Sequence, residues 1–490
     1  MKKIIFILIL SSQMSFASFD MNSNIKRSYL HIINLEFKEA NKLLDIERKC
    51  NSQNGFIPLH ENYIDFFKII INEDVLYFKS HEKLKGNRIQ LINKNDKSSP
   101  YFLYSKSEIT LQWALARLKF GEYAKASLEL LKAYRMLEEN KHKFPEFTLN
   151  NKGLGLMHAL LGSIPDEFNW LLNIADLKSD FSLGIKELNS ILDDNKFSLY
   201  EEETLFILSF LQINLGNNDT VCRNYLDRIG ERYKDNILLN FTAARLSYYL
   251  GENDQCLNIL SNRPGNEKLM KFYYLDYLEA MAYLYKLDLI NSKKKFEYFL
   301  HNFKGNNYVK SAYNNLAKIA FLQNNKNEML SYTKNVILKG STFVEVDKAS
   351  FNDANKQEYS HSILLRARLL YDGGYYKKSL LEIRQFIELL SFASASEKSE
   401  YWYRLARIQS KLNYNDKQVV TNYKIALENG INNEEYYAPM SALQIGIIYE
   451  KQNDVFNARF FFKKCISMSG FDYQRGIHQK ARAGLSRVLE

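Results

Sequence analysis

A small residue stands seven positions before a predicted inter-helix turn at eight places along this chain. The small residues are Ala114, Ser209, Ala244, Ala280, Ala317, Ala367, Ala406 and Gly446. The matching turn residues are Gly121, Gly216, Gly251, Leu287, Asn324, Gly374, Asn413 and Asn453. From Gly216 onward the turns are 35, 36, 37, 50, 39 and 40 residues apart. Such an interval is typical of stacked helical hairpins, in which small side chains let paired helices cross closely.

The interval of 50 residues between Asn324 and Gly374 is longer than its neighbours. The extra residues fall in 340–359, which we interpret as a polar loop or an irregular helix. Insertions on one face of a helical-repeat protein can mark the functional face. The alternative is a tolerated surface insertion without a role.

The N-terminus has the pattern of a secretory signal peptide. Lys2 and Lys3 precede an apolar run at Ile4–Leu10, and Ser15-Phe16-Ala17 ends in a small residue. We expect cleavage after Ala17, which removes two lysines and changes the formal net charge from +10 to +8. The apolar run is too short to span a bilayer. The sequence therefore predicts an exported protein, in the bacterial periplasm or outside the cell.

Three domains are predicted: a signal peptide at 1–17, an irregular helical domain at 18–198 and a repeat array at 199–490. In the irregular domain, apolar spacing predicts one helix over Ile25–Arg48 and another over Ile64–Phe78. Residues 85–100 are expected to form an exposed connection. The glycines and Pro165 within Asn150–Leu192 predict broken, buried helices.

The chain has four cysteines, Cys50, Cys222, Cys256 and Cys465, and no Cys-x-x-Cys motif. An oxidising compartment would permit a disulfide, and Cys222 and Cys256 hold similar places in adjacent hairpins. The alternative is that the cysteines are small residues buried between helices. The spacing supports neither zinc nor a redox motif.

The last hairpin reads Leu443-Gln444-Ile445-Gly446-Ile447-Ile448-Tyr449 on its first helix, then Asn453-Asp454 and Ala458. This pattern resembles the tetratricopeptide repeat (TPR), a family with Leu-Gly-x-x-Tyr, a Gly-Asp turn and a small residue on the second helix. The resemblance covers roughly residues 109–137 and 199–490 and implies an all-α fold, an α-solenoid of about 8 to 10 TPR-like helical hairpins. Departures from the pattern include Arg117, Gln212 and Gln409 in place of the tyrosine, and Val221, Met329 and Gln418 at the second-helix small position.

A second pattern contains Gly153-Leu154-Gly155, Asp180 and Gly184, preceded by Glu36-Phe37-Lys38-Glu39-Ala40. It is similar to the eukaryotic inclusion-body-clearance type of TPR protein, over roughly residues 25–200. That resemblance supplies no catalytic residue.

No motif for catalysis, a cofactor or a metal is found in the sequence. A metalloprotease His-Glu-x-x-His, a phosphate-binding glycine loop and a Gly-x-Ser-x-Gly elbow are all missing. Basic residues do not gather in a dense run interleaved with aromatics, so nucleic acid is not an expected partner. We expect a protein that is not an enzyme, with no cofactor and no metal.

The TPR resemblance implies that the first helix of each pair lines a concave groove. Counted from the small residue, the groove-facing places are three before, one after and four after. The chosen groove residues are Phe241, Arg245, Tyr248, Tyr277, Lys318, Arg368, Tyr371, Tyr403 and Arg407. This lining combines aromatic and basic side chains and contains no acid, which suits a peptide with acidic groups or a free carboxylate.

The sequence therefore predicts an exported scaffold or adaptor that binds a protein or peptide partner. Two alternatives remain open at this point. One is a peripheral outer-membrane or envelope assembly factor, and the other is an enzyme associated with cell-wall glycan.

Overall fold

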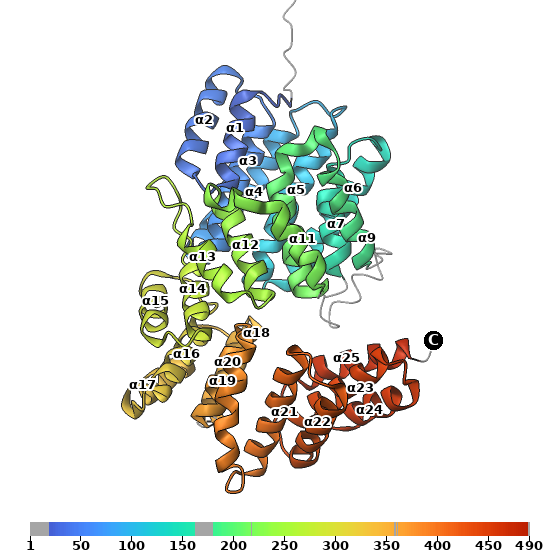
Figure 1. The fold of residues 1–490 in the computed structure, drawn as a ribbon. Helices are drawn as coiled ribbons and strands as arrows, with labels where there is room; N and C mark the ends of the chain where they lie inside the picture. The colour runs from blue at the N-terminus through green and yellow to red at the C-terminus, as the bar shows by residue number, and fades with distance from the viewer. Residues whose placement is uncertain (1–18, 162–179, 217, 357–358, 360, 489–490) are drawn as a thin grey trace, which may run out of the picture. The chain divides into compact units, whose positions relative to one another are not determined.

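The structure is a computed structural model that describes residues 19–161, 180–216, 218–356, 359 and 361–488 (Figure 1). These residues form helices joined by turns and short connections, and no strand occurs among them. The expected signal peptide, Pro165 and the rest of 162–179 lie outside the described residues. The chain folds as the all-α, TPR-like class that was predicted.

Contacts divide the chain into two compact units. Unit 1 contains residues 1–246, 258–274 and 303–305, and unit 2 contains 247–257, 275–302 and 306–490. The chain passes from one unit to the other within α12 (Ile237–Tyr249) and α13 (Asn253–Ser261). The predicted domain boundary at 198/199 stays a prediction, because a division by contacts does not locate the ends of repeats.

Unit 1 is built mainly of antiparallel helix pairs. Its helices are α1 (Ser23–Ile33), α2 (Phe37–Cys50), α3 (Phe56–Asn72), α4 (Val75–Ile92), α5 (Pro100–Lys119), α6 (Tyr123–Lys143), α7 (Asn150–Leu161), α9 (Phe181–Leu192), η2 (Asn195–Tyr200), α10 (Glu201–Leu211), η3 (Gln212–Gly216), α11 (Asp219–Ile229) and η4 (Gly230–Lys234).

Three predictions for α1 to α4 are wrong. The helix expected over Ile64–Phe78 is divided between α3 and α4, because Glu73 has a left-handed φ of 54°. The helix expected over Ile25–Arg48 is broken at Leu35, whose φ of 57° is left-handed, and the amide of Glu36 closes the turn by donating to the carbonyl of His31 at 2.8 Å. The connection expected at 85–100 is largely helix α4, and its Arg88 and Ile92 are buried. Arg88 forms an ion pair there with Asp65 at 2.5 Å. This tertiary contact stabilises a helix that the polar composition of the segment did not predict.

Two glycines explain how α7 and α9 pack. A Cβ on Gly155 would lie 2.7 Å from the carbonyl oxygen of Gly184, and a Cβ on Gly184 would lie 2.5 Å from that of Gly155. Only residues without a side chain permit backbones to meet this closely. Helices α7 and α9 in 150–192 are the separate helical pieces that were expected there, and α7 is largely buried.

A buried polar cluster ties several helices of unit 1 together. The Lys152 side chain, 2% exposed, donates to Glu203 at 2.7 Å, to Glu108 at 3.2 Å and to the Tyr63 hydroxyl at 2.5 Å. Tyr29 also donates to Glu203, at 2.6 Å. Burial raises the pKa of the Glu203 carboxyl, against the opposing effect of the Lys152 charge. A buried lysine held by two carboxylates fixes the relative positions of the helices that carry them.

Unit 2 contains the more regular hairpins. Its helices are α14 (Tyr274–Tyr285), α15 (Leu289–Asn302), α16 (Val309–Leu322), α17 (Lys326–Leu338), α18 (Glu345–Lys356), α19 (Ser362–Asp372), α20 (Tyr376–Arg384), η5 (Gln385–Leu389), α21 (Ala395–Lys411), α22 (Asp416–Gly430), α23 (Tyr437–Lys451), α24 (Val455–Ser467) and α25 (Gln474–Arg487).

The predicted turn residues adopt the left-handed backbone, with one exception. Their φ angles lie between 57° and 79° at Gly121, Gly251, Leu287, Asn324, Gly374, Asn413 and Asn453. The next amide closes each turn by donating to a carbonyl five residues back, as from Asp454 to Tyr449 at 2.9 Å. This is the Schellman geometry that ends a helix. Gly216 is the exception, because it belongs to the π-helix η3 and not to such a turn.

The small residues lie at the helix crossings, as predicted. All eight are buried, and a Cβ on Gly446 would lie 2.7 Å from the ring of Phe462 on the second helix. In two hairpins a serine on the second helix donates to the carbonyl of that small residue, Ser292 to Ala280 at 2.8 Å and Ser379 to Ala367 at 2.6 Å. The four cysteines are free thiols, so the Cys222–Cys256 disulfide is not formed, and Cys256 and Cys465 are buried packing residues.

Candidate functional site

Two of the predicted groove residues belong to unit 1 and contact its own chain. The ring of Phe241 packs on Phe272, with centroids 5.1 Å apart, and on Tyr274 at 5.7 Å. Arg245 donates from Nη1 to the Tyr274 hydroxyl at 3.1 Å. These two side chains therefore support the segment that follows α13.

Two tyrosines that were expected to face a groove are core residues. Tyr277 is 5% exposed and Tyr403 is 4% exposed. The Tyr277 hydroxyl lies 2.8 Å from the Ser311 hydroxyl on α16, and the Tyr403 ring packs on Tyr437 of α23 at 5.6 Å. The prediction is wrong for these two tyrosines, because the first helix of the next hairpin covers each of them.

Tyr248 joins two neighbouring hairpins of unit 2. Its ring stacks on Tyr285 with centroids 5.3 Å apart, and the two hydroxyls are hydrogen-bonded at 2.8 Å. The pair lies near the turns at Gly251 and Leu287. Tyr248 is half-buried and contributes to packing between hairpins.

The remaining basic residues gather with two acids that sequence reasoning missed. Lys318 of α16 lies 3.4 Å from Asp353, Arg368 of α19 lies 3.6 Å from Asp372, and Arg407 of α21 lies 3.9 Å from the same Asp372. We call these five residues the central cluster. The expected lining without an acid is therefore wrong. Asp372 could have been found five places after Ala367, but Asp353 comes from the insertion, which the repeat pattern does not describe.

Burial and neighbouring charges both shift the pKa values of side chains in the central cluster. Burial alone would raise the pKa of the Asp353 carboxyl, but the charges of Lys318 and Arg368 outweigh it and hold that pKa below its ordinary value. Burial lowers the pKa of Lys318, and Asp353 partly offsets the effect. Three cations against two carboxylates leave one positive charge in excess.

Arg407 and Arg368 differ in how firmly they are held. The guanidinium carbon of Arg407 lies 4.1 Å from the centroid of the Tyr371 ring and 5.4 Å from that of Tyr403, so two aromatic faces fix it. Arg368 keeps 40% of its side chain exposed. Among the described residues, Asp372 is its one ion-pair partner. Arg368 is therefore the cation of the cluster most available to a ligand.

The insertion covers one side of this region. It forms the helix α18, which packs against α16 and α17, and not a loop. Asp353 accepts from the side-chain Nδ2 of Asn314 at 3.0 Å. Tyr359 donates to the side-chain Oδ1 of Asn314 at 3.3 Å, and its ring stacks on Phe321 at 5.4 Å. The chain itself thus occupies the face of α16 that was expected to meet a ligand.

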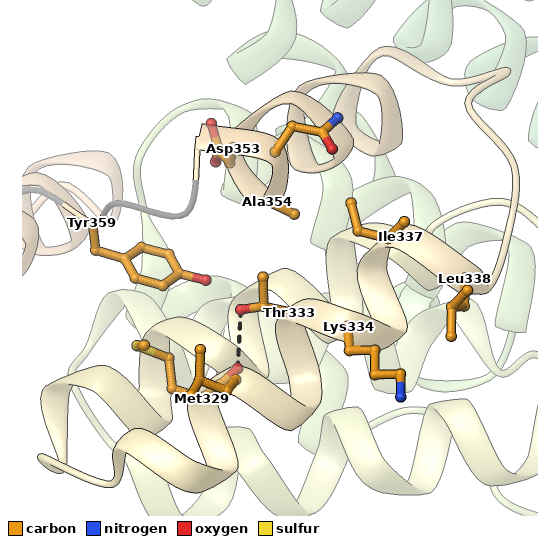
Figure 2. A pocket seen from close by; sticks show the side chains of 10 residues that line it. Met329, Thr333, Lys334, Ile337, Leu338, Asp353, Ala354 and Tyr359 are labelled. Atoms are coloured by element: carbon orange, nitrogen blue, oxygen red, sulfur yellow. Dashed lines mark hydrogen bonds between the residues drawn. The ribbon is translucent and has the colours of Figure 1, made fainter.

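A pocket opens between α17 and the insertion (Figure 2). Its volume is about 330 Å³. Figure 2 shows Tyr359, Asp353 and Ala354 across from the α17 side chains, where Thr333 donates to the carbonyl of Met329 at 2.9 Å. The lining residues are Met329, Leu330, Thr333, Lys334, Ile337, Leu338, Asp353, Ala354, Asn355 and Tyr359. Asp353 belongs both to this pocket and to the central cluster.

Within the described part of the chain, no group of histidine, cysteine, aspartate and glutamate side chains has the arrangement of a metal site. A search of the same residues also finds no helix that combines the length and the apolar character needed to cross a bilayer.

Three solved structures resemble the chain weakly. The APC/C hetero-tetramer Cut9–Hcn1 is 10% identical, over 94% of this chain and 95% of that chain, with a TM-score of 0.26. Yeast Tom70 is 12% identical over 95% of each chain, with a TM-score of 0.24. The Naa15/Naa10 structure with HypK-THB bound is 12% identical, over 95% of this chain and 66% of that chain, with a TM-score of 0.25.

No protein-family model and no curated protein sequence matches the chain. The three TM-scores are too low to support a fold or a function. The class of the protein is therefore defined by its own hairpins, with their buried small residues and left-handed turns. It is an all-α protein of TPR-like helical repeats, and the resemblance to the inclusion-body-clearance type stays a prediction.

Proposed function

We propose that this protein is an exported scaffold that binds a partner protein through unit 2 and acts by binding, not by catalysis. The observation that carries the proposal is the central cluster. It places cations from three successive first helices, α16, α19 and α21, next to one another, and Arg368 keeps 40% of its side chain in solvent. First helices are the elements that line the concave face of a TPR-like stack.

The chemistry of the cluster selects an acidic ligand. A guanidinium presents paired N–H donors that fit a carboxylate, whether from an aspartate, a glutamate or a chain terminus. Asp372 holds Arg368 at 3.6 Å, a distance that leaves its donors able to change partner. The adjacent pocket of about 330 Å³ accommodates an apolar side chain of the same segment. We therefore expect an extended peptide with a carboxylate and a neighbouring apolar residue.

A peptide array tests this function directly. The probes are extended peptides that carry an acidic residue or a free C-terminal carboxylate, and matched peptides with amide side chains and an amidated end. The protein should retain the acidic set, and Arg368→Glu should weaken binding roughly tenfold or more, because it replaces attraction by repulsion. Arg384→Glu is the matched control, since Arg384 is an exposed arginine of α20.

Equal retention of acidic and amidated peptides would contradict the proposed ligand. Equal loss of binding in both arginine variants would also contradict it, because the effect would then follow net charge and not the cluster.

Location in the periplasm or outside the cell is part of the proposal. It is supported by the N-terminal charge and apolar pattern at 1–17. The role that we favour is an adaptor in envelope assembly or secretion.

A further inference from the structure

The excess positive charge of this protein is concentrated at its C-terminal end. The whole chain has a formal net charge of +10, whereas residues 455–488 alone carry seven basic side chains and one acid, Asp472. The basic residues are Arg459, Lys463, Lys464, Arg475, Lys480, Arg482 and Arg487. These residues belong to α24 and α25, which pack together as the last two helices of unit 2.

Helix α24 presents aromatic rings to solvent. Phe456 is 81% exposed, Phe460 is 56% exposed and Val455 is 51% exposed. Arg459 and Lys463 are also exposed, and their spacing from the two rings places all four side chains on one side of the helix. Among the described residues, neither cation has an ion-pair partner. We call Val455, Phe456, Arg459, Phe460 and Lys463 the α24 face.

The opposite side of α24 is firmly packed. Ala458, Phe461, Phe462 and Cys465 are buried in the core that α24 shares with α23 and α25. The N-terminus of the helix is capped by Asp454, which accepts from the amide of Asn457 at 3.0 Å. The α24 face is therefore held on a rigid element, and its exposed rings are not the consequence of a loosely attached helix.

Exposure of a ring alone is not what distinguishes this face. Phe392 of unit 2 is 90% exposed, but it lies in the turn between η5 and α21, where the adjacent charged residues are Glu388 and Glu397. On α24 the rings alternate with cations, and the first acid after Asp454 is Asp472. Arginine and lysine side chains next to exposed rings can extend their charged ends to lipid phosphates while the rings enter the apolar side of a membrane interface.

We propose that the α24 face binds the surface of an anionic lipid bilayer. Its two phenylalanine rings and Val455 enter the boundary between headgroups and acyl chains, while Arg459 and Lys463 pair with lipid phosphates above them. In a bilayer the negatively charged phosphates lie directly above an apolar layer. Rings that enter the apolar layer therefore leave the charged ends of Arg459 and Lys463 at the depth of the phosphates. The face is the outward side of a second helix, so it is separate from the central cluster and goes beyond the proposed protein-binding function.

Vesicle flotation with the purified protein tests the proposal. The probes are vesicles of phosphatidylethanolamine with roughly one-quarter phosphatidylglycerol, and vesicles of phosphatidylcholine alone. The protein should float with the anionic vesicles and remain at the bottom with the zwitterionic ones. The floating fraction should fall as salt is raised, because the cations are exposed.

Two double variants separate the contributions of the face. Phe456→Ser with Phe460→Ser should lower the partition coefficient roughly tenfold or more, because two rings can no longer enter the bilayer. Arg459→Glu with Lys463→Glu should remove the preference for anionic lipid. Phe392→Ser is the matched control for an exposed ring and should float as the unaltered protein does. Far-UV circular dichroism checks that each variant is folded.

Flotation of both double variants at the unaltered level would overturn the proposal, as would equal binding to the two kinds of vesicle. Binding to polyglutamate without binding to anionic vesicles would also overturn it, by assigning the face to an acidic polypeptide. Arg368→Glu should leave flotation unchanged, so failure of the groove function does not affect this test.

Discussion

At the scale of single residues, two kinds of position explain most of the fold. Small residues such as Ala280 and Ala367 let paired helices touch, and their carbonyls receive the second-helix serines. Turn residues reverse the chain by taking a left-handed φ, even at Leu287, where φ is 62°. Both were predictable because each follows from one residue and its spacing. Leu35 was not, because it lies outside the repeat spacing that located Leu287, and a leucine alone gives no sign of a left-handed turn.

Gly374 has less room for a side chain than an ordinary turn glycine has. Its φ is 79°, and a Cβ there would lie 1.8 Å from the carbonyl oxygen of Gly251. Gly470 has the same φ of 79°, with nothing within 4 Å of a Cβ. Gly470→Ala should therefore cost about 1–2 kcal/mol of unfolding free energy, for the left-handed backbone alone. Gly374→Ala should cost clearly more, because the backbone must also move. Denaturant melts of the full chain monitored by circular dichroism compare the two variants, and equal losses would contradict the contact.

His60 makes the stability of unit 1 sensitive to acid. Burial lowers the pKa of its imidazole to about 3, and its Nδ1 lies 2.6 Å from the Ser28 hydroxyl. The unfolded chain binds a proton near pH 6.5, but the native state does not until about pH 3. Stability from this residue is therefore complete above pH 6.5 and is lost as the pH falls, by about 2 kcal/mol between pH 7 and pH 5.

Hydrogen exchange of the α1 and α3 amides at the two pH values measures this effect, after correction for intrinsic exchange. The variant His60→Gln should lose most of the pH dependence that the unaltered protein shows in these helices. A pH dependence of the same size in the variant would assign the effect to other groups.

At the scale of elements, α18 shows what the repeat pattern could not predict. The sequence located the insertion at 340–359 but gave its form as a loop or an irregular helix. In the structure it is a helix whose Asp347 accepts from the amides of Tyr308 at 2.5 Å and Ser311 at 2.8 Å. Asp347 thereby provides hydrogen-bond acceptors for the amides at the start of α16, and α18 places Asp353 next to Lys318. These contacts join segments about 40 residues apart, so no local period predicts them.

Removal of the Asp347 carboxylate should destabilise both α16 and α18. Asp347 is fully buried, and Asp347→Ala leaves two amides of α16 without an acceptor, at a cost of about 1–3 kcal/mol. Hydrogen exchange at residues 308–312 should accelerate, and exchange in α18 should accelerate with it. Asp454→Ala is the control, because it removes a half-buried helix cap on α24 and should affect that helix alone. Unchanged exchange in α16 would contradict this role of the insertion.

The predicted groove residues show a second limit of sequence-based prediction at the element scale. Lys318, Arg368 and Arg407, one residue after the small residue, come together through their acids, and their role in a groove stays a prediction. Tyr277 and Tyr403, three residues before it, are buried and do not face a groove. Burial there depends on how the next hairpin packs, and the spacing within one hairpin contains no information about that packing.

At the scale of the whole molecule, the predicted repeat array at 199–490 contributes residues to both compact units. Within unit 2, turns far apart in sequence touch. Gly251 meets Gly374, and the Tyr375 hydroxyl lies 3.1 Å from Asn253 and 2.8 Å from Asp254. These contacts join hairpins that are not neighbours in the sequence. The repeat interval of 35 to 40 residues therefore does not predict them.

Export is also a property of the whole chain. We expect the mature protein to begin at Ser18, because the small residues Ser15 and Ala17 fit a signal-peptidase site. Intact-mass analysis of the protein from the periplasmic or secreted fraction of a bacterial expression host should show the loss of residues 1–17. Recovery from the cytoplasm with Met1–Ala17 still attached would contradict export.

The central claim is that first helices of unit 2 bind an acidic partner segment through the central cluster. Hydrogen exchange with and without a saturating acidic peptide from the array tests this claim most directly. We expect new protection in α19 and α21, around Arg368 and Arg407, and Arg368→Glu should abolish it. Protection confined to the second helices α20 and α22, with α19 and α21 unchanged, would contradict it.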